Sequence, residues 1–545
     1  MSEGKSPGAF APLRNRVFAV LWVATVVGNI GGWMRDTASA WAMTELAPSP
    51  VMVALVQAAA TLPIFLFSLP AGALADIVDR RRMMIMVQAG LAAVSLSLGL
   101  AALTGFLTPP LLLALTLVAG IGAALAGPVW QSIVPELVPR PDFKPAVALN
   151  SLGINIARAI GPALGGAIIV GLGVAAAYLI DVATYAVTIA ALVWWNRMPS
   201  QAALPEHLGG AMHAGMRYTL ASAPLRRVLL RAVIFFAPAS CYWALLPLVA
   251  RSEIGGGAAG YGILLAAVGV GAIGGALLMP RLRARLSGER VTLLATLATA
   301  ACTAALAFVH SVAAGAAVLA VAGAAWIMVL TMLNATAQAV LPNWVRGRGL
   351  AVYLTVFFGT MTVGSLLWGQ VAEATSLDAA LLVAGGVGAA SALAGRALVL
   401  PSGDEDLSPS HHWPEPTVVD GTAPAGGPIM VMIEYRVFLE RQPAFADAMH
   451  DLGTIRRRDG AYEWGLMADA AEPERVTEWF LVASWEEHLR QHERVSVADR
   501  ALQDRVRAFH AADAAPLVRH LVPLGSATSA AAVEHMSHVD SEDAT

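Results

Sequence analysis

The chain has 545 residues, of which 57% are hydrophobic and only 13% are charged, and its mean hydropathy is +0.64. Soluble domains carry about 25% charged residues, so this composition excludes an ordinary water-soluble protein and indicates folding in a lipid bilayer. The two cysteines, Cys241 and Cys302, lie in apolar stretches, which excludes a disulfide framework and a cysteine metal site.

The net charge of −3 conceals two regions of opposite charge. Residues 1–400 contain 23 Lys and Arg against 13 Asp and Glu, whereas residues 401–545 contain 12 against 25. We therefore divide the chain near Pro401 into a membrane region and an acidic soluble region. The apolar stretch after Arg16 is too long for a signal peptide and lacks a small-residue cleavage site, so it predicts an uncleaved first span.

Apolar runs of about 20 residues, long enough to cross a bilayer, recur twelve times. They predict helices, because each backbone polar group in lipid must find a partner within its own segment. The expected spans lie at about residues 16–43, 51–75, 83–105, 110–133, 146–170, 174–195, 228–251, 259–280, 291–310, 313–338, 349–373 and 378–399.

The distribution of basic residues predicts the orientation of these spans. The N-terminus and the even-numbered loops carry 19 Lys and Arg, whereas the odd-numbered loops carry Arg251 alone. Because basic loops remain in the cytoplasm, we expect a multi-pass plasma-membrane protein with both termini cytoplasmic. The loop at 201–227 separates the spans into six and six, and Ala211–Leu220 within it predicts an amphipathic helix on the membrane surface.

The two sets of spans also repeat in sequence, which predicts six-helix halves at 1–200 and 228–400. The segment QSIVPELV from Gln131 matches QAVLPNWV from Gln338, and GPALGG from Gly161 matches GSLLWG from Gly364. Parallel six-span repeats are the design of one large transporter fold. The repeat therefore favours a transporter over a receptor or a membrane enzyme.

The loop between spans 2 and 3 resembles the signature loop of the major facilitator superfamily, Gly-x-x-x-Asp-(Arg/Lys)-x-Gly-Arg-(Arg/Lys). Gly72, Asp76, Arg80 and Arg81 stand in register with it, while Ile77 and Asp79 replace a base and a glycine. Together with PELVPR at 135–140, the loop resembles the subgroup of transmembrane secretion effector type that includes the enterobactin exporter and macrolide efflux proteins. The resemblance covers residues 10–400 and implies an exporter of small organic molecules.

The same loop predicts a conformational latch formed by Gly72, Asp76, Asp79, Arg80 and Arg81. Gly72 permits close approach of the eleventh span, and Asp76 favours the positive N-terminal end of that helix. Arg80 and Arg81 are expected to pair with Asp76 or Asp79, so that the two halves are held together on the cytoplasmic side. The alternative is that these charges are solvated and serve only to set the topology.

The fifth span contains a helix-packing motif of Gly161, Pro162, Gly165 and Gly166. It resembles the Gly-x-x-x-Gly-Pro-x-x-Gly-Gly motif of exporters in this superfamily that work as antiporters, with Ala157 in place of the first glycine. Proline removes a backbone donor and glycines permit close packing. Tight packing follows from the residues themselves, whereas antiport is implied by the resemblance alone.

Four ionisable residues lie within the expected spans of the first half: Arg35, Asp36, Arg158 and Asp181. Charges at this depth are costly and indicate function. We expect the two aspartates to share the charges of the two arginines, with Asp36 as the preferred carrier of a transported proton. The alternative is a fixed structural ion pair.

Beyond a Pro- and Gly-rich linker at 401–428, residues 429–525 predict a soluble α+β domain, and residues 526–545 predict a disordered tail. Strands at Ile429–Val437, Glu463–Ala468, Thr477–Ala483 and Pro516–Val522, with helices at Gln442–Arg458 and Trp485–His510, give the ferredoxin-like order βαββαβ. The segments 456–464 and 484–492 resemble dimeric α/β-barrel domains related to antibiotic-biosynthesis monooxygenases, which implies a homodimer.

We thus predict an all-α membrane protein of the major facilitator fold with a ferredoxin-like C-terminal domain. The expected function is proton-coupled export, with the bilayer, a small-molecule cargo and protons as partners. We expect no catalytic residue, cofactor, metal or nucleic acid; His488 and His492 stand one helical turn apart, but no third ligand is evident in the sequence. The alternative is a membrane-tethered enzyme or a cargo-sensing module that uses the C-terminal domain.

Overall fold

The computed structural model describes residues 10–195, 216–402, 405–410, 413 and 427–523. The chain forms two compact units. The membrane unit comprises Met1–Leu208, Arg227–Thr336 and Ala351–Leu400, and the C-terminal unit comprises Gly209–Arg226, Ala337–Leu350 and Pro401–Thr545. The predicted disordered tail and residues 211–215 of the predicted amphipathic helix lie outside the described residues, although residues 216–221 are helical.

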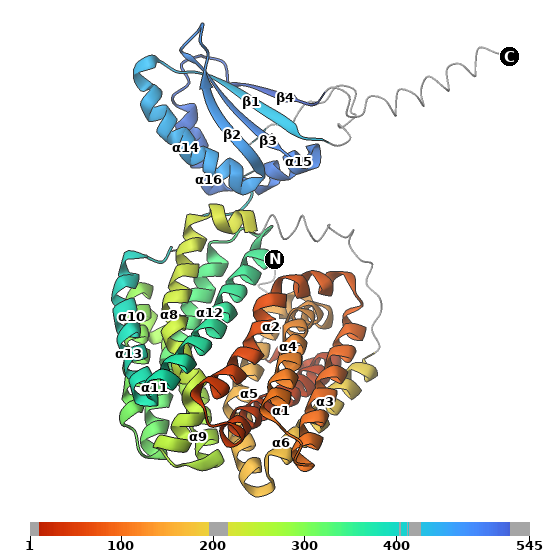
Figure 1. Ribbon diagram of the computed structural model, residues 1–545. Coiled ribbons are helices and arrows are strands. Elements are labelled where there is room, and N and C mark those ends of the chain that lie inside the picture. Colours follow the sequence, from red (N-terminus) through yellow and green to blue (C-terminus); the bar gives the residue numbers. More distant parts are fainter. Residues whose placement is uncertain (1–9, 196–215, 403–404, 411–412, 414–426, 524–545) are drawn as a thin grey trace, which may run out of the picture. The chain divides into compact units, whose positions relative to one another are not determined.

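All twelve predicted spans are confirmed as helices that are long and apolar enough to cross a membrane. Figure 1 shows them as two groups that follow each other in sequence, α1–α6 in red to orange and α8–α13 in yellow-green to teal. Their bounds are α1 Arg16–Leu46, α2 Pro50–Ile77, α3 Arg80–Leu103, α4 Pro109–Leu137, α5 Phe143–Leu172, α6 Val174–Trp194, α8 Ala223–Leu248, α9 Gly257–Arg283, α10 Gly288–Ala305, α11 Val312–Ala339, α12 Arg346–Ala374 and α13 Leu377–Ala394.

Helix α3 begins earlier than predicted and includes the arginine cluster. The Asp79 side chain accepts a hydrogen bond from the Arg82 backbone N–H at 2.8 Å, so Asp79 caps the helix and Arg80 occupies its first position. A carboxylate at this position satisfies an amide that has no partner within the helix. The arginines therefore extend from the first helical turn rather than from an irregular loop.

Helix α5 packs between α1 and α9 through the glycines of its motif. A Cβ at Gly161 would lie 2.9 Å from the Ile30 carbonyl oxygen of α1. On another side of α5, a Cβ at Gly166 would lie 2.7 Å from the Ala258 carbonyl oxygen of α9 and 3.0 Å from the Gly262 Cα. Because lipid supplies no hydrophobic force between helices, such backbone contacts between small residues are a main source of their association. The α5–α9 contact joins the two halves.

The C-terminal unit contains a four-stranded antiparallel sheet with helices in the order β1 Ile429–Arg436, α14 Gln442–Asp459, β2 Ala461–Ala468, β3 Arg475–Val482, α15 Trp485–Arg494, α16 Val497–Arg507 and β4 Leu517–Leu521. The strand order is β2-β3-β1-β4, with β1 pairing antiparallel to both β3 and β4. Alternate residues of β1 and β3 are buried against α14 and α16, and they form the core of this unit. The more specific assignment as a ferredoxin-like domain remains a prediction.

The prediction of one helix over Trp485–His510 is wrong, because the segment forms two helices. Val495 is extended, and Ser496 begins α16 with a capping box: its hydroxyl accepts from the Asp499 N–H, while the Asp499 carboxylate accepts from the Ser496 N–H. This reciprocal capping satisfies two backbone donors at the start of a new helix. The Ser-x-x-Asp signal is present in the sequence at Ser496 and Asp499, between two charged segments with a helical pattern.

The predicted flexible linker is partly ordered against the C-terminal unit. The Ser410 N–H donates to the Val495 carbonyl at 2.9 Å, and the Val497 N–H donates to the Ser408 carbonyl at 3.0 Å. Further along, the Trp413 indole N–H donates to Gln503 Oε1 at 2.7 Å. The described part of residues 405–413 thus packs along the junction of α15 and α16.

The α5–α9 contact gives a first prediction. Gly262→Val places a side chain against the Pro162 carbonyl oxygen, which would lie 2.7 Å from its Cβ, so we expect a loss of about 1–3 kcal/mol from overpacking. Scanning fluorimetry of the detergent-purified chain measures this as a lowered Tm. Gly274→Val on the same helix is the control, since no atom lies within 4 Å of its Cβ; equal Tm values for the two variants would contradict the role of this contact.

Candidate functional site: a charged cavity in the first half

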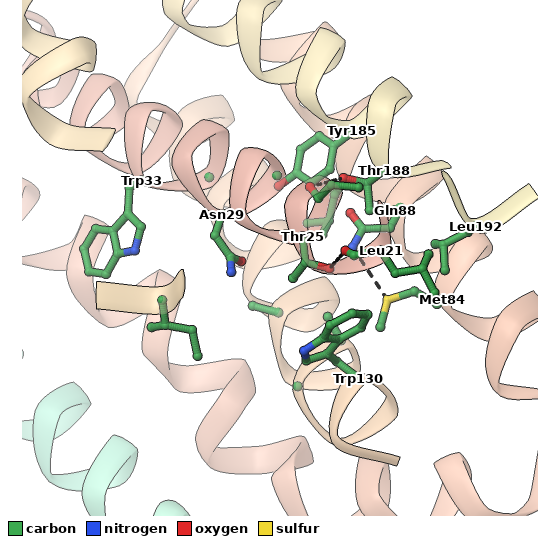
Figure 2. A pocket seen from close by; sticks show the side chains of 18 of the residues that line it. Leu21, Thr25, Asn29, Trp33, Met84, Gln88, Trp130, Tyr185, Thr188 and Leu192 are labelled. Atoms are coloured by element: carbon green, nitrogen blue, oxygen red, sulfur yellow. Dashed lines mark hydrogen bonds between the residues drawn. The ribbon is translucent and has the colours of Figure 1, made fainter. Parts of the chain in front are cut away.

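A cavity of about 340 Å³ lies among the first six helices (Figure 2). Its lining residues come from α1, α3, α4, α5 and α6, largely from the turns nearer the face that carries Arg80–Arg82. Figure 2 shows the Asn29, Trp33 and Trp130 side chains projecting into the same space. Its wall is mainly apolar, with polar groups at a few positions, which is the usual composition of a small-molecule site.

The polar groups of the wall are held by the helices around it. The Trp130 indole N–H donates to Asn150 Oδ1 at 2.7 Å, which ties α4 to α5. The Gln88 Oε1 atom is buried and makes no hydrogen bond within the described chain. Such a buried carbonyl oxygen leaves an acceptor for a bound molecule, because an unpaired polar atom in a dry site is costly.

Three of the four predicted charges meet at one end of this cavity. The Arg35 guanidinium lies 2.8 Å from Asp36 Oδ1 and 3.8 Å from Asp181 Oδ2, and it donates a hydrogen bond to the Tyr185 hydroxyl at 2.7 Å. The Ser95 hydroxyl donates to Asp181 at 2.7 Å. The arginine therefore joins two carboxylates that come from α1 and α6.

The two carboxylates differ in their access to the cavity. The Asp36 side chain is 50% exposed and lines the cavity, whereas the Asp181 side chain is fully buried. Asp181 accepts a hydrogen bond from the Ser95 hydroxyl and forms its ion pair with Arg35 away from the cavity. Asp36 is thus the carboxylate that a proton or a bound molecule can reach.

Arg158 stands apart from this cluster. No ion pair joins it to a carboxylate in the part of the chain that the structure describes, and its guanidinium carbon lies 5.6 Å from the centroid of the Trp33 ring. The predicted sharing of two arginines between two aspartates therefore reduces to Arg35 alone in this conformation.

The arginines of the predicted latch contact the first half. Arg80 pairs with Glu136 of α4 at 2.6 Å, and the Arg81 guanidinium donates to the carbonyls of Leu192 and Val193 at the end of α6. The side chain of Asp76 and the surroundings of Gly72 lie outside the described residues. The latch between the halves therefore stays a prediction.

Helices α2 and α12 contact each other across the two halves through hydroxyl groups. Thr61 and Thr362 lie 2.8 Å apart, and Ser68 and Thr355 also lie 2.8 Å apart. At the end of α2 remote from the arginine cluster, Glu373 accepts from the Ser49 hydroxyl at 2.6 Å. This carboxylate thus lies against the first turn of α2.

The C-terminal unit has a separate cavity of about 160 Å³, lined by residues that include Tyr435, Arg456, Phe480 and His488. Arg456 pairs with the fully buried Glu478 at 2.9 Å. Burial, with smaller effects of two neighbouring histidines, lowers the pKa of His488 to about 3, so this imidazole is neutral at physiological pH.

The structure brings a third histidine to the pair noted in the sequence. His488 Nε2 lies 2.9 Å from His520 Nε2 and 3.4 Å from His492 Nε2. Among the described side chains, however, no group of three or more is arranged to hold a metal ion.

Sequence reasoning missed several residues that shape the membrane cavity, namely Ser95, Trp130 and Tyr185. Each is an ordinary polar or aromatic residue of a hydrophobic helix, and its partner is 20 to 150 positions away in the chain. A polar residue within a span is a weak signal for such a contact. Only the packing of the helices identifies the partner.

Comparison with known proteins agrees with this architecture. A family described as transmembrane secretion effector matches residues 7–528. The Staphyloferrin A transporter of Staphylococcus aureus (strain NCTC 8325 / PS 47) is 25% identical over 258 residues, which is 46% of this chain and 64% of that protein. The chain thus matches less than two thirds of this curated relative.

Solved structures share the fold of the membrane unit at low sequence identity. A POT family transporter in complex with 5-aminolevulinic acid has a TM-score of 0.59 and 12% identity, over 71% of this chain and 96% of that one. A bacterial homologue of the human lysosomal transporter Spinster, in an inward-facing and occupied conformation, has a TM-score of 0.56 and 14% identity, over 71% and 98%. Because the family match covers nearly the whole chain, the protein belongs to the transmembrane secretion effector family of membrane transporters with the major facilitator fold.

Proposed function

We propose that the protein is a proton-coupled exporter of small organic molecules, of a siderophore-like or drug-like kind, that works by alternating access between its two six-helix halves. The observation that carries this proposal is the half-exposed Asp36 carboxylate, which lines a cavity and shares one arginine with the buried Asp181. The relative that transports staphyloferrin A supports a siderophore-like cargo. The resemblance of the fifth span to antiporter motifs supports export in exchange for protons.

The charge balance of the cluster explains why Asp36 is suited to carry a proton. Arg35 supplies one positive charge to two carboxylates, so the cluster has one excess negative charge when both are ionised. Uptake of one proton makes the net charge of the cluster zero. Because Asp181 is buried against Arg35 and Ser95, the proton exchanges at Asp36 in this proposal.

Asp36→Asn is therefore expected to abolish proton-coupled transport while the chain still folds. Asparagine keeps the shape of the side chain and can accept a hydrogen bond from Arg35, but it cannot exchange a proton. The measurement is uptake of staphyloferrin A into proteoliposomes under an imposed pH gradient, and we expect at least about a tenfold loss of the gradient-driven rate.

Glu45→Gln on the same helix is the matched control, since Glu45 is exposed and accepts only the Trp41 indole N–H at 2.7 Å among its described contacts. This variant is expected to transport at the wild-type rate. Gradient-driven uptake that is unchanged in Asp36→Asn would refute the role of Asp36.

Alternating access requires contacts between the halves that break on one face at a time. Glu373 is suited to this role. It lies in the last turn of α12, where the dipole of its own helix disfavours a negative charge. It accepts a hydrogen bond from Ser49 at the start of α2, where the dipole of that helix favours a negative charge. In our proposal this bond holds the face remote from the arginine cluster closed.

Glu373→Gln is expected to shift the equilibrium about two- to fivefold towards the conformation that is open on this face, because a charge–dipole contact of about 0.3–1 kcal/mol is weakened. Spin labels at Thr104 and His310, with Cys241 and Cys302 replaced, report the separation of the halves by pulsed electron resonance. Glu253→Gln is the control. A distance distribution that is the same in all three chains would show that Glu373 does not hold this face.

The C-terminal cavity favours a second candidate function, a small-molecule sensing or enzymatic module attached to the transporter. A chain truncated after Leu400, measured in the proteoliposome assay, tests whether the C-terminal unit is an accessory module or part of the transport cycle. We expect the truncated chain to transport with the wild-type dependence on the pH gradient, as an accessory module would allow. Loss of transport in a truncated chain whose Tm equals that of the full-length chain would instead make this unit part of the transport cycle.

A further inference from the structure

Arg158 is a cation inside the membrane unit, and no carboxylate among the described residues forms an ion pair with it. Its Nε atom is buried and makes no hydrogen bond within the described chain. Elsewhere in the same unit the buried arginines are paired: Arg35 with two aspartates and Arg231 with Glu289 at 2.6 Å. An unpaired charge at this depth is costly. A site of this kind therefore favours a molecule that brings a negative charge.

The Trp33 ring compensates for only part of this cost. The guanidinium carbon of Arg158 lies 5.6 Å from the ring centroid, within the range of a cation–π contact. Such a contact provides the field of a quadrupole rather than a full negative charge, and the buried Nε donor still lacks an acceptor among the described residues. The ring orients the cation without neutralising it.

The position of Arg158 relates it to the cavity of the first half. Asn150 and Ile154 of α5 line this cavity, and Arg158 follows Ile154 by four residues on the same helix face. Trp33, the ring that contacts Arg158, is itself a lining residue. Arg158 thus lies at the Trp33 end of the cavity, one helical turn beyond Ile154, the last residue of α5 that lines it.

The second half of the bundle supplies a further polar group near this cation. The Tyr242 hydroxyl of α8 is close enough to Arg158 to interact with its charge. Tyr242 Oη is buried and has no hydrogen-bond partner of suitable geometry in the described chain. A hydroxyl can donate a hydrogen bond. A guanidinium beside such a donor matches a carboxylate or a similar oxyanion.

We propose that Arg158 binds an anionic group of the cargo, so that the transported molecules are organic anions with at least one carboxylate or equivalent oxyanion. This inference rests on the proposed function as a transporter of small organic molecules and specifies the charge of its cargo. It gives the two arginines different tasks: Arg35 holds the aspartates, and Arg158 neutralises the cargo. The apolar wall with Trp33 and Trp130 then accommodates the uncharged body of the molecule.

Equilibrium binding to the full-length chain in detergent, at one pH and without any gradient, tests this inference. The probes are staphyloferrin A, citrate and phthalate, each compared with its fully esterified methyl ester, in which no carboxylate remains to carry a negative charge. We expect at least one of the acids to bind saturably and its ester to bind at least about tenfold more weakly. Arg158→Gln is expected to weaken binding of that acid at least about tenfold and to leave the ester unchanged.

Two further variants guard against a general effect on folding. Arg158→Lys keeps the charge but loses the planar fork of donors, so it should retain part of the preference for the acid. Arg16→Gln removes a comparable cation–π contact, that of Arg16 with Trp194 at 5.8 Å, and should bind the acid as the wild type does. A Tm equal to that of the wild-type chain establishes that each variant is folded.

The inference is overturned if none of the acids binds, if acid and ester bind equally well, or if Arg158→Gln binds the acid as tightly as the wild type. Because this assay contains neither a pH gradient nor a transport step, these outcomes leave proton coupling at Asp36 untouched. Conversely, gradient-independent uptake in the proteoliposome assay would refute proton coupling without affecting the role of Arg158.

Discussion

Our account of this transporter depends on the two ion pairs that Arg35 forms with Asp36 and Asp181. A charged group in a low-dielectric interior must be paired, must be neutralised by a proton, or must acquire a partner from outside. Arg35 and Asp181 satisfy the first condition, since both are buried and form an ion pair at 3.8 Å. Asp36 shares the same arginine but faces the cavity, and we propose that a proton neutralises it. For Arg158, which has an aromatic ring as its described neighbour, we propose a partner from outside, the anionic group of the cargo.

The packing of the helices keeps these charges in place, and its contacts between the halves fit the alternating access that we propose. Close contacts of Gly161 with α1 and of Gly166 with α9 hold α5 against both halves of the bundle. Between α2 and α12 the contacts are hydroxyl pairs and the Glu373 bond. Single hydrogen bonds of this kind are individually weak. They therefore suit a surface that, in our proposal, separates and closes again in each transport cycle.

The sequence predicted the twelve helices because span length and hydropathy are local properties of the chain. It also identified Asp36, Arg35, Arg158 and Asp181, since a charge in an apolar run is visible without any contact information. The pairing among these four groups could not be predicted, because it depends on how α1, α5 and α6 pack. Tyr185 and Ser95 were missed for the same reason. The break between α15 and α16 was in principle readable from Ser496 and Asp499, but the charged helical pattern on both sides concealed it.

In the soluble part of the chain, too, features set by neighbouring residues could be predicted, whereas contacts between distant residues could not. Its strands lie within a few residues of the predicted positions, because alternating burial is a local pattern. The ion pair of Arg456 with the buried Glu478 and the approach of His520 to His488 arise from strand pairing and were not foreseen. These contacts surround the C-terminal cavity and define a site that is distinct from the one in the membrane unit.

Proton exchange on cargo binding is the measurement that tests the central claim most directly. Staphyloferrin A is added to the wild-type chain in weakly buffered detergent solution, and the pH change is followed with an indicator dye after correction for the proton content of the ligand. Our account predicts that about one proton is exchanged with the solvent per bound molecule, and that Asp36→Asn abolishes this exchange, because the cluster of Arg35, Asp36 and Asp181 couples proton binding to cargo binding. Saturable binding without any release or uptake of protons would contradict it.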